Sequence, residues 1–517
     1  MNRNELLQQL DDAGIWDIVV IGGGATGLGT AVDAASRGYR TLLLEQRDFA
    51  AGTSSRSTKL IHGGFRYLRQ GQLGQVRRAL HERHLLIRNA PHLVHPLAFV
   101  VPLYHWWEGP FYGMGLKFYD LLAVRYGLGP SQHLSRAETL RAIPTVEPAG
   151  LRGGVLYHDG QFDDARLAVS LARTLADLGG VPLNYVAVTG FLKTGGRIAG
   201  VFACDRETGR EYRLRARVVV NATGVFADAI RRLDDSVAAP LIEPSQGAHI
   251  VLDRSFLPGD SAIMIPRTDD GRILFLIPWH GRVLVGTTET AVATISPDPR
   301  PLREEIDFLL AHAARYLSCH PARKDVLSVF AGLRPLVRSG AREKTAALSR
   351  DHAILVSRPG LVSVMGGKWT TYRRMGQDAV DRALAVAGLP ARPSGTKALK
   401  IHGWQADAAE DPWGVYGSDA AVLKELAATH PAGAELLHPH LPYRTCEVAW
   451  AVRNELARTV EDVLARRTRS LFVDAAASMA MARRVAQLMA AELGRDDAWQ
   501  RRQVEDFCTL ARNYVPT

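Results

Sequence analysis

Residues 17–45 read DIVVIGGGATGLGTAVDAASRGYRTLLLE, and this stretch decides the fold class. It opens with a short β-branched run, residues 17–21, which predicts a buried strand. A helix-like stretch, residues 25–37, follows and is closed by Gly38. Between them lie three glycines in GxGxxG spacing: Gly22, Gly24 and Gly27. The sequence therefore predicts a strand, a tight turn and a helix in that order.

The glycines of this turn fit a binding site for a dinucleotide. A side chain at Gly24 would keep a pyrophosphate away from the backbone amides, and the helix N-terminus supplies partial positive charge. Glu45 lies about 20 residues beyond Gly24, the spacing of an acidic residue that binds ribose hydroxyls. Its carboxylate would repel the 2′-phosphate of NADP, so the motif indicates NAD or FAD. The alternative is an ordinary glycine-rich turn, against which the strand, the helix and Glu45 argue together.

Two later segments repeat the passage from a strand into a turn of small residues. Residues 217–224, RVVVNATG, read as a buried strand that enters such a turn. Residues 361–373, LVSVMGGKWTTYR, read as a strand, a glycine pair and a helix, with Thr370 and Thr371 placed to cap the helix. Three such segments far apart along the chain predict one composite nucleotide-binding fold that insertions interrupt.

The composition is that of a globular protein of two or three domains. The 517 residues are 47% hydrophobic and 22% charged, which excludes a disordered, collagen-like or disulfide-scaffold protein. A net charge of +10 favours anionic partners without selecting nucleic acid, phosphate metabolite or lipid. The four cysteines lie far apart and show no metal-binding spacing, so we predict reduced thiols and no metal site. No apolar run approaches the roughly 18 residues that span a bilayer.

A longer motif resembles a known family. Residues 52–68, GTSSRSTKLIHGGFRYL, closely resemble the signature of the FAD-dependent glycerol-3-phosphate dehydrogenases. The resemblance continues in order through NATG at 221–224, QGAHIV at 246–251, GTTE at 286–289, AGLRPL at 331–336, SRDH at 349–352 and GGKWTTYR at 366–373. Residues 446–469, CEVAWAVRNELARTVEDVLARRTR, resemble the helical cap of these enzymes.

This resemblance implies an FAD enzyme that oxidises sn-glycerol 3-phosphate at C2 to dihydroxyacetone phosphate. Hydride would pass to the flavin, and electrons would pass on to a membrane quinone. A glycerol-3-phosphate oxidase, which uses O2, shares these motifs and remains the alternative. An FAD-carrying protein that binds nucleic acid could exploit the net charge, but no sequence motif supports one, so no nucleic-acid partner is expected.

The same chemistry points to residues for substrate binding and proton transfer. A dianionic phosphate needs fixed donors, and the resemblance places four near the substrate: Arg66, Tyr67, Arg334 and Lys368. The C2 hydroxyl needs a base, and an imidazole can accept a proton near neutral pH. We favour His249 over His62, both of which lie in family motifs. Lys368 could instead be the base if desolvation lowered its pKa, or it could polarise the hydroxyl together with Arg334. The expected catalytic residues are therefore His249, Arg334 and Lys368.

The motifs also supply the expected cofactor site. Noncovalent FAD is expected to contact residues of the three strand-to-turn segments and of the 52–68 motif. These are Gly22, Gly24, Ala25, Thr26, Gly27, Glu45, Thr53, Ser54, Ser55, His62, Gly63, Ala222, Thr223, Gly224, Gly367, Lys368 and Thr370.

The expected architecture is α/β (α+β), with a Rossmann-like FAD-binding domain interleaved with a mixed-sheet substrate domain and an all-helical C-terminal domain. Residues 1–95, 150–240 and 340–388 form the expected FAD-binding domain. Residues 96–149 and 241–339 form the substrate-binding, membrane-facing domain, and 396–517 the C-terminal cap, after a linker at 388–395. Apolar residues at helical spacing predict core stripes in the cap: Val448, Val452, Leu456 and Val460, then Met481, Val485 and Leu488.

Residues 102–129, PLYHWWEGPFYGMGLKFYDLLAVRYGLG, are dense in aromatic side chains. They could dip into a lipid interface, or they could form a helix that packs its apolar face on the core. The basic excess at residues 59–88 could face an anionic membrane, or it could be a solvated helix face with the substrate arginines. We therefore expect a cytoplasmic protein, peripheral on the inner face of the cytoplasmic membrane, with an anionic lipid surface as partner. A homodimer is also possible.

Overall fold

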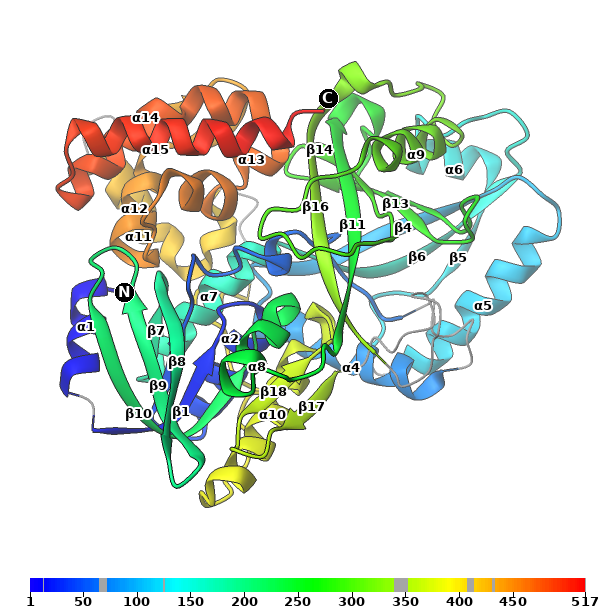
Figure 1. Ribbon diagram of the computed structural model, residues 1–517. Coiled ribbons are helices and arrows are strands. Elements are labelled where there is room, and N and C mark those ends of the chain that lie inside the picture. Colours follow the sequence, from blue (N-terminus) through cyan, green and yellow to red (C-terminus); the bar gives the residue numbers. More distant parts are fainter. Residues whose placement is uncertain are drawn as a thin grey trace.

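The structure is a computed structural model that describes residues 1–12, 14–64, 72–123, 126–338, 352–406, 413–429 and 433–516. Two large sheets lie beside each other, and the helices of the C-terminal region pack above the first of them (Figure 1). The expected combination of a mixed α/β nucleotide fold, a mixed-sheet domain and a helical C-terminal domain is confirmed.

The first sheet is built around β1 (Ile15–Ile21), and its strand order is β17-β18-β10-β1-β2-β7. The strands from β18 to β7 run parallel, whereas β17 and the β8–β9 pair join antiparallel. Ile18, Val19 and Val20 are fully buried, as expected for a parallel strand covered on both faces. The other bounds are β2 Thr41–Leu44, β7 Val181–Leu183, β8 Val186–Thr194, β9 Arg197–Asp205, β10 Glu211–Asn221, β17 Ala353–Val356 and β18 Val362–Met365.

Helix α2 (Ala25–Ser36) follows β1 through the glycine turn, as the sequence predicted. A Cβ at Gly27 would lie 1.8 Å from the carbonyl oxygen of Gly22, so the helix can approach the strand only with glycine there. α2 packs between α7 (Asp164–Asp177) and α10 (Tyr372–Ala387). Helix α1 (Arg3–Asp12) lies beside β7, and α8 (Ala227–Asp234) follows the turn after β10.

The second sheet has the order β15-β11-β14-β13-β12-β4-β6-β3, with β16 beside β11 and β5 beside β6. β11 (Ile242–Asp253) and β16 (Val326–Val337) pair antiparallel over most of their length, which sets His249 opposite Phe330 and Arg334 opposite Ser245. The remaining strands are β3 Leu60–Ile61, β4 Val94–Leu103, β5 Gln132–Ser135, β6 Gly153–Phe162, β12 Ala262–Ile265, β13 Leu274–Trp279, β14 Arg282–Gly286 and β15 Thr290–Ala291.

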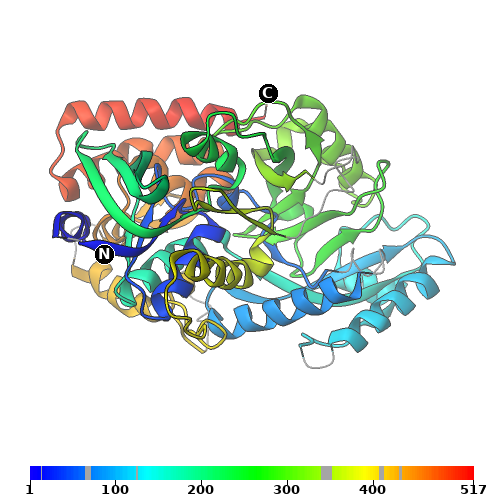
Figure 2. The same cartoon turned by 60° about the horizontal axis from the view of Figure 1, so that its bottom comes forward.

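Four helices flank this sheet: α4 Leu73–Asn89, α5 Glu108–Ala123, α6 Arg136–Ala142 and α9 Arg303–Ala314. α5 lies at the outer edge of the molecule, away from the C-terminal helices (Figure 1 and Figure 2). No helix in the described part of the chain is both long and apolar enough to cross a bilayer.

The C-terminal region is helical, with α11 Ala420–Thr429, α12 Thr445–Glu455, α13 Ser470–Val473, α14 Ala475–Leu493 and α15 Asp497–Ala511. A two-stranded sheet of β19 (Leu436–His438) and β20 (Leu441–Arg444) interrupts the helices. The predicted core stripe is buried at Val448, Leu456 and Val460, but one helix does not span it, because Leu456 ends α12 in a left-handed conformation (φ 56°). The four-residue spacing of buried apolar side chains therefore continues to Val460, beyond the C-terminal end of the helix.

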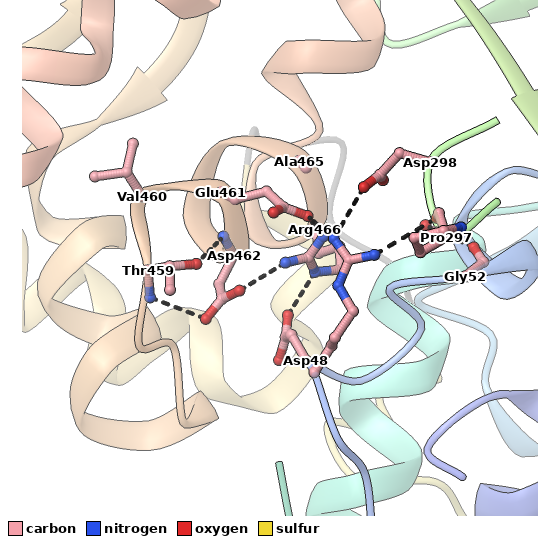
Figure 3. A network of polar contacts seen from close by, with 12 residues as sticks. Asp48, Gly52, Pro297, Asp298, Thr459, Val460, Glu461, Asp462, Ala465 and Arg466 are labelled. Carbon is pink, nitrogen blue, oxygen red and sulfur yellow. Dashed lines mark hydrogen bonds and ion pairs between the residues drawn. The ribbon is translucent and has the colours of Figure 1, made fainter. Parts of the chain in front are cut away.

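Buried ion pairs join the C-terminal region to the loop after β2. Figure 3 shows Arg466 between Asp48 of that loop and two acidic residues of its own segment, Glu461 and Asp462, with contacts of 2.6 Å to each. Burial alone would raise the pKa of Asp48, but Arg467 and Arg466 hold it at about 2. The C-terminal region is therefore fixed against a loop of the first domain, because a buried pair costs about 3–5 kcal/mol to break.

The structure corrects both interpretations for two residues of the basic excess at 59–88, whereas Arg77, Arg78 and Arg88 are exposed, as expected for a solvated helix face. Lys59 is fully buried and pairs with Asp164 at 2.7 Å. Arg83 is 1% exposed and pairs with Asp159 at 2.7 Å. Neither faces a membrane or solvent, since each neutralises a buried carboxylate about 80–100 residues further along the chain.

Candidate active site

A cavity of about 690 Å³ lies where the two sheets meet. The residue after each of four parallel strands lines it: Gly22 after β1, Glu45 after β2, Ala222 after β10 and Gly366 after β18. The second sheet contributes His249 of β11, Phe275 of β13 and Arg334 of β16, among others. The cavity thus occupies the carboxyl ends of the parallel strands, where open α/β sheets bind ligands.

The turn after β1 has the form of a dinucleotide site. Gly24 is the N-cap of α2 and caps it with no side chain, and the first helical amide, Ala25 N–H, donates to Ser54 Oγ at 3.0 Å. Glu45 accepts from the amides of Gly23 at 2.7 Å and Arg47 at 2.8 Å, which orients its carboxylate at the end of β2. Burial raises the pKa of Glu45, opposed by these two hydrogen bonds.

Most of the expected cofactor residues line the cavity. They are Gly22, Gly24, Ala25, Thr26, Glu45, Thr53, Ser54, His62, Ala222, Thr223, Gly224, Gly367, Lys368 and Thr370. Gly27, Ser55 and Gly63 do not line it. Gly27 packs α2 against Gly22, the Ser55 carbonyl accepts from Lys59, and the Gly63 amide donates to Asp159.

His249 lies in the cavity wall and is 2% exposed. Its Nε2 is 3.0 Å from Thr58 Oγ1, and its ring stacks on Phe330 with 4.8 Å between the centroids. Within the described residues, Nδ1 has no hydrogen-bond partner. Burial lowers the pKa of His249 well below its usual value, and the charges of Lys59 and Arg334 lower it further. The imidazole is therefore neutral at pH 7 and can accept a proton.

Arg334 is fixed by its neighbours in the second sheet. Its guanidinium donates to the carbonyl oxygen of Gln246 at 3.2 Å, to Thr287 Oγ1 at 3.2 Å and to the carbonyl oxygen of Thr288 at 3.1 Å. A Cβ at Gly247 would lie 2.4 Å from Arg334 Nη2, so the glycine makes room for the guanidinium. The result is a positioned cation in the cavity wall, a form suited to binding phosphate.

The third expected catalytic residue, Lys368, lines the cavity just before the short helix η6 (Trp369–Thr371). Trp369 Nε1–H donates to the Ser54 carbonyl at 2.9 Å and so ties this segment to the 52–68 motif. The predicted capping by Thr371 is wrong, because its hydroxyl donates backwards to the Lys368 carbonyl at 3.3 Å. Thr370 does not cap α10 either, since Thr371 holds the N-cap position.

His62, the alternative base, lies in the cavity wall, whereas two expected substrate residues lie outside the described part of the chain. His62 lines the cavity with its side chain 43% exposed, and its ring contacts Phe275 with 5.4 Å between the centroids. Arg66 and Tyr67 lie outside the described residues.

Sequence reasoning did not single out several residues that contact His249 and Arg334. Thr58, the partner of His249, stands within the 52–68 motif, so the motif itself carried a signal. Thr287, the partner of Arg334, stands in GTTE at 286–289, but only the sheet register shows which hydroxyl meets the guanidinium. No feature of the sequence indicates that Phe330 contacts His249, because this stacking depends on the pairing of β11 with β16.

The cavity residues fit FAD. The turn at Gly24 brings the N-terminus of α2 to the cavity with no side chain at the N-cap, which suits a pyrophosphate. Glu45 stands at the end of β2 for a ribose, and the glycine turns after β10 and β18 leave room for a ring system. His249 and Arg334 of the second sheet line the same cavity.

Comparison with known proteins gives a consistent result. A family model described as FAD dependent oxidoreductase matches residues 17–373. A second, described as the C-terminal domain of alpha-glycerophosphate oxidase, matches residues 362–500. The human mitochondrial glycerol-3-phosphate dehydrogenase is 38% identical over 98% of this chain and 74% of the human protein. The mitochondrial enzyme of Arabidopsis thaliana is 39% identical over 95% of this chain and 85% of its own length.

Solved structures agree with the sequence matches. The glycerol-3-phosphate dehydrogenase of Bacillus halodurans, crystallised with FAD, is 30% identical, with a TM-score of 0.81 over 99% of this chain and 97% of that chain. The FAD-bound L-alpha-glycerophosphate oxidase of Mycoplasma pneumoniae is 17% identical, with a TM-score of 0.58 over 75% of this chain and 98% of that chain. The second likeness shows a shared fold only.

Proposed function

The chain belongs to the family of FAD-dependent glycerol-3-phosphate dehydrogenases, and from that premise we propose that a membrane quinone is the final acceptor of its electrons. The family membership makes FAD the cofactor and sn-glycerol 3-phosphate the substrate, with oxidation at C2 giving dihydroxyacetone phosphate. Bound FAD supplies the two-electron acceptor for this oxidation. The residues proposed to hold it are the fourteen expected ones that line the cavity.

The proposed residue roles rest on one observation. The neutral imidazole of His249 and the fixed guanidinium of Arg334 lie near each other in one wall of the cavity. Arg334 binds the substrate phosphate, with Lys368, Arg66 and Tyr67 as further donors. His249 accepts the proton of the C2 hydroxyl as the C2–H bond breaks and its electron pair leaves as hydride. The alcohol thereby loses two electrons and two hydrogens and becomes the ketone.

Substrate binding adjusts the basicity of His249. The positive charge of Arg334 is one cause of the low pKa of His249. A bound phosphate dianion offsets that charge and raises the pKa of His249 towards the operating pH, where a general base is most effective. The base is therefore strengthened when the substrate is present.

We propose that α5 contacts the membrane. Its apolar side chains that are exposed, together with two tryptophans before it, form an aromatic ridge: Trp106 (77% exposed), Trp107, Phe111, Met114, Phe118 and Leu121. Leu116 and Tyr119 of the same helix are buried and hold it to the domain. The buried face of the helix fits the interpretation of core packing, and we propose that the exposed face is the one that enters the lipid interface. Location at the inner face of the cytoplasmic membrane is part of this proposal, and so is the assignment of residues 96–149 and 241–339 to a membrane-facing domain.

Changing Trp106, Trp107 and Phe111 to Ser is expected to weaken sedimentation with anionic liposomes by about tenfold or more, since each buried side chain contributes about 1.5–3 kcal/mol. The matched control changes three exposed apolar residues elsewhere, Phe202, Leu233 and Val237, to Ser. The control is expected to bind as the parent does. If the ridge variant binds the liposomes as well as the parent does, the aromatic residues do not hold the protein on the membrane.

The electron acceptor is tested with flavin reduced by glycerol 3-phosphate under argon. Addition of a soluble ubiquinone analogue is expected to restore the yellow colour rapidly, whereas air is expected to restore it slowly. Stoichiometric peroxide release at a rate comparable with turnover would instead establish an oxidase, the alternative that the description of the C-terminal family model keeps open.

A further inference from the structure

A buried lysine that the proposed reaction does not use lies behind the active-site wall. The Lys59 ammonium is fully buried and donates to Asp164 Oδ2 and to the Ser55 carbonyl, each at 2.7 Å. It also faces the rings of Trp279 and Phe330, each 5.3 Å from the centroid. Lysine is almost never fully buried unless it is paired, because its desolvation costs several kcal/mol.

Asp164 links this lysine to the loop of residues 53–59. Ser57 donates to Asp164 Oδ2 through its amide at 3.1 Å and its hydroxyl at 2.7 Å. From the C-terminal region, Arg469 donates to Asp164 Oδ1 and to the Ser55 carbonyl, each at 2.9 Å. The loop is therefore held from α7 on one side and from the C-terminal region on the other.

The loop held in this way carries Thr58, whose hydroxyl oxygen lies 3.0 Å from His249 Nε2. The Phe330 ring that Lys59 faces is the ring on which His249 stacks, at an interplanar angle of 15°. Lys59 thus reaches His249 by two routes, through the backbone to Thr58 and through Phe330.

The charge of Lys59 also acts on His249. The charged groups that lower the pKa of His249 are Lys59 from the loop and Arg334 from β16, after burial itself. On the β14 side the neighbour is Gly286, where a Cβ would lie 2.1 Å from His249 Cδ2. Burial lowers the pKa of Lys59 to about 7, against the effect of Asp164, so the ammonium is charged in the acidic range where His249 would take up a proton.

We propose that Lys59 is a positioning residue whose buried ammonium fixes the 53–59 loop, and with it Thr58, against His249, and keeps the imidazole in its neutral, proton-accepting form. The inference rests on the proposed role of His249 as the base. Lys59 touches no substrate atom in this scheme and acts only through His249 and Thr58.

The charge part is tested with Lys59→Met, which removes the charge and keeps most of the side-chain length. The titration midpoint of His249 is expected to rise by about one pH unit, since a nearby like charge depresses a histidine pKa by about that much or more. NMR of protein labelled with ¹³C at histidine Cε1 measures the midpoint, and the signal absent from His249→Asn identifies His249. The acid limb of the rate of flavin reduction is expected to move to higher pH by the same amount.

The matched control is Arg166→Met. Arg166 is a buried cation of the same helix as Asp164 and pairs with Glu455 at 2.8 Å, but its charge is not among the causes that shift His249. It loses a buried ion pair of the same kind and is expected to leave the His249 midpoint unchanged. If Lys59→Met does not fold, Lys59→Gln keeps a donor towards Asp164 and carries the same expectation.

The loop part is tested with Ser57→Ala, which keeps the charge of Lys59 and removes one anchor of the loop. We expect about tenfold slower flavin reduction at saturating substrate, with unchanged flavin content and an unchanged His249 midpoint. An unmoved midpoint in Lys59→Met or Lys59→Gln, or a parent-like rate in Ser57→Ala, overturns the proposal. A midpoint that moves while the acid limb stays in place supports the effect of Lys59 and refutes His249 as the base.

Discussion

Gly24→Val is expected to yield a protein that folds but purifies without flavin. A Cβ at Gly24 would lie 3.0 Å from Ser54 Oγ, and the two methyl groups of valine would extend into the cavity at the N-terminus of α2. There they occupy the place of the pyrophosphate and screen the first helical amides from it. Overpacking and the loss of a hydrogen bond to a charged group each cost about 1–3 kcal/mol, so FAD affinity falls by about 100-fold or more.

The flavin released on denaturation, measured per mole of protein, checks this result. Gly14→Val is the matched control, because a Cβ at Gly14, just before β1, meets no atom within 4 Å. The control is expected to keep its flavin. Equal thermal stability of Gly24→Val and flavin-stripped parent would show that the loss lies in binding and not in folding. A Gly24→Val protein with stoichiometric FAD would contradict the assignment of the dinucleotide turn.

The features that the sequence predicted well are those decided within a few residues. The unit β1–turn–α2 follows from a β-branched run, a glycine spacing and apolar periodicity, all of which are local. The other strands that end at the cavity could also be predicted, because their sequence signals are equally local. Because parallel strands end at one edge of a sheet, three separate turns predicted one site.

The features that the sequence missed depend on residues far apart in the chain. Lys59 reads as a solvated or membrane-facing cation until the fold brings Asp164 and three aromatic rings around it. The end of α12 at Leu456 was hidden, because the residue after the helix is as apolar as the helix core. The hydroxyl of Thr371 had two backbone targets, and only the short helix before α10 decided between them.

Arg334→Ala and His249→Asn are expected to separate substrate binding from chemistry. Arg334 is fixed by Thr287 and two carbonyl oxygens for a phosphate, so its loss should cost about 2–4 kcal/mol, or about 30-fold to 1,000-fold in kcat/KM for glycerol 3-phosphate. The slow reaction of glycerol, which has no phosphate, should hardly change. Arg338→Ala, at an exposed position just beyond the end of β16, is the matched control and should leave both reactions unchanged.

His249→Asn acts at a different step, because it removes the group that takes the hydroxyl proton and leaves Arg334 in place. Flavin reduction at saturating substrate should slow by about 100-fold to 10,000-fold, the usual contribution of a general base, while substrate affinity stays near that of the parent. Stopped-flow bleaching under argon over a range of substrate concentrations measures both quantities in one experiment. A His249→Asn enzyme that reduces its flavin at the parent rate would move the role of base to Lys368 or His62, both of which line the same cavity. An Arg334→Ala enzyme with unaltered affinity and rate would remove the phosphate site from β16, and with it the argument that a bound dianion raises the pKa of His249.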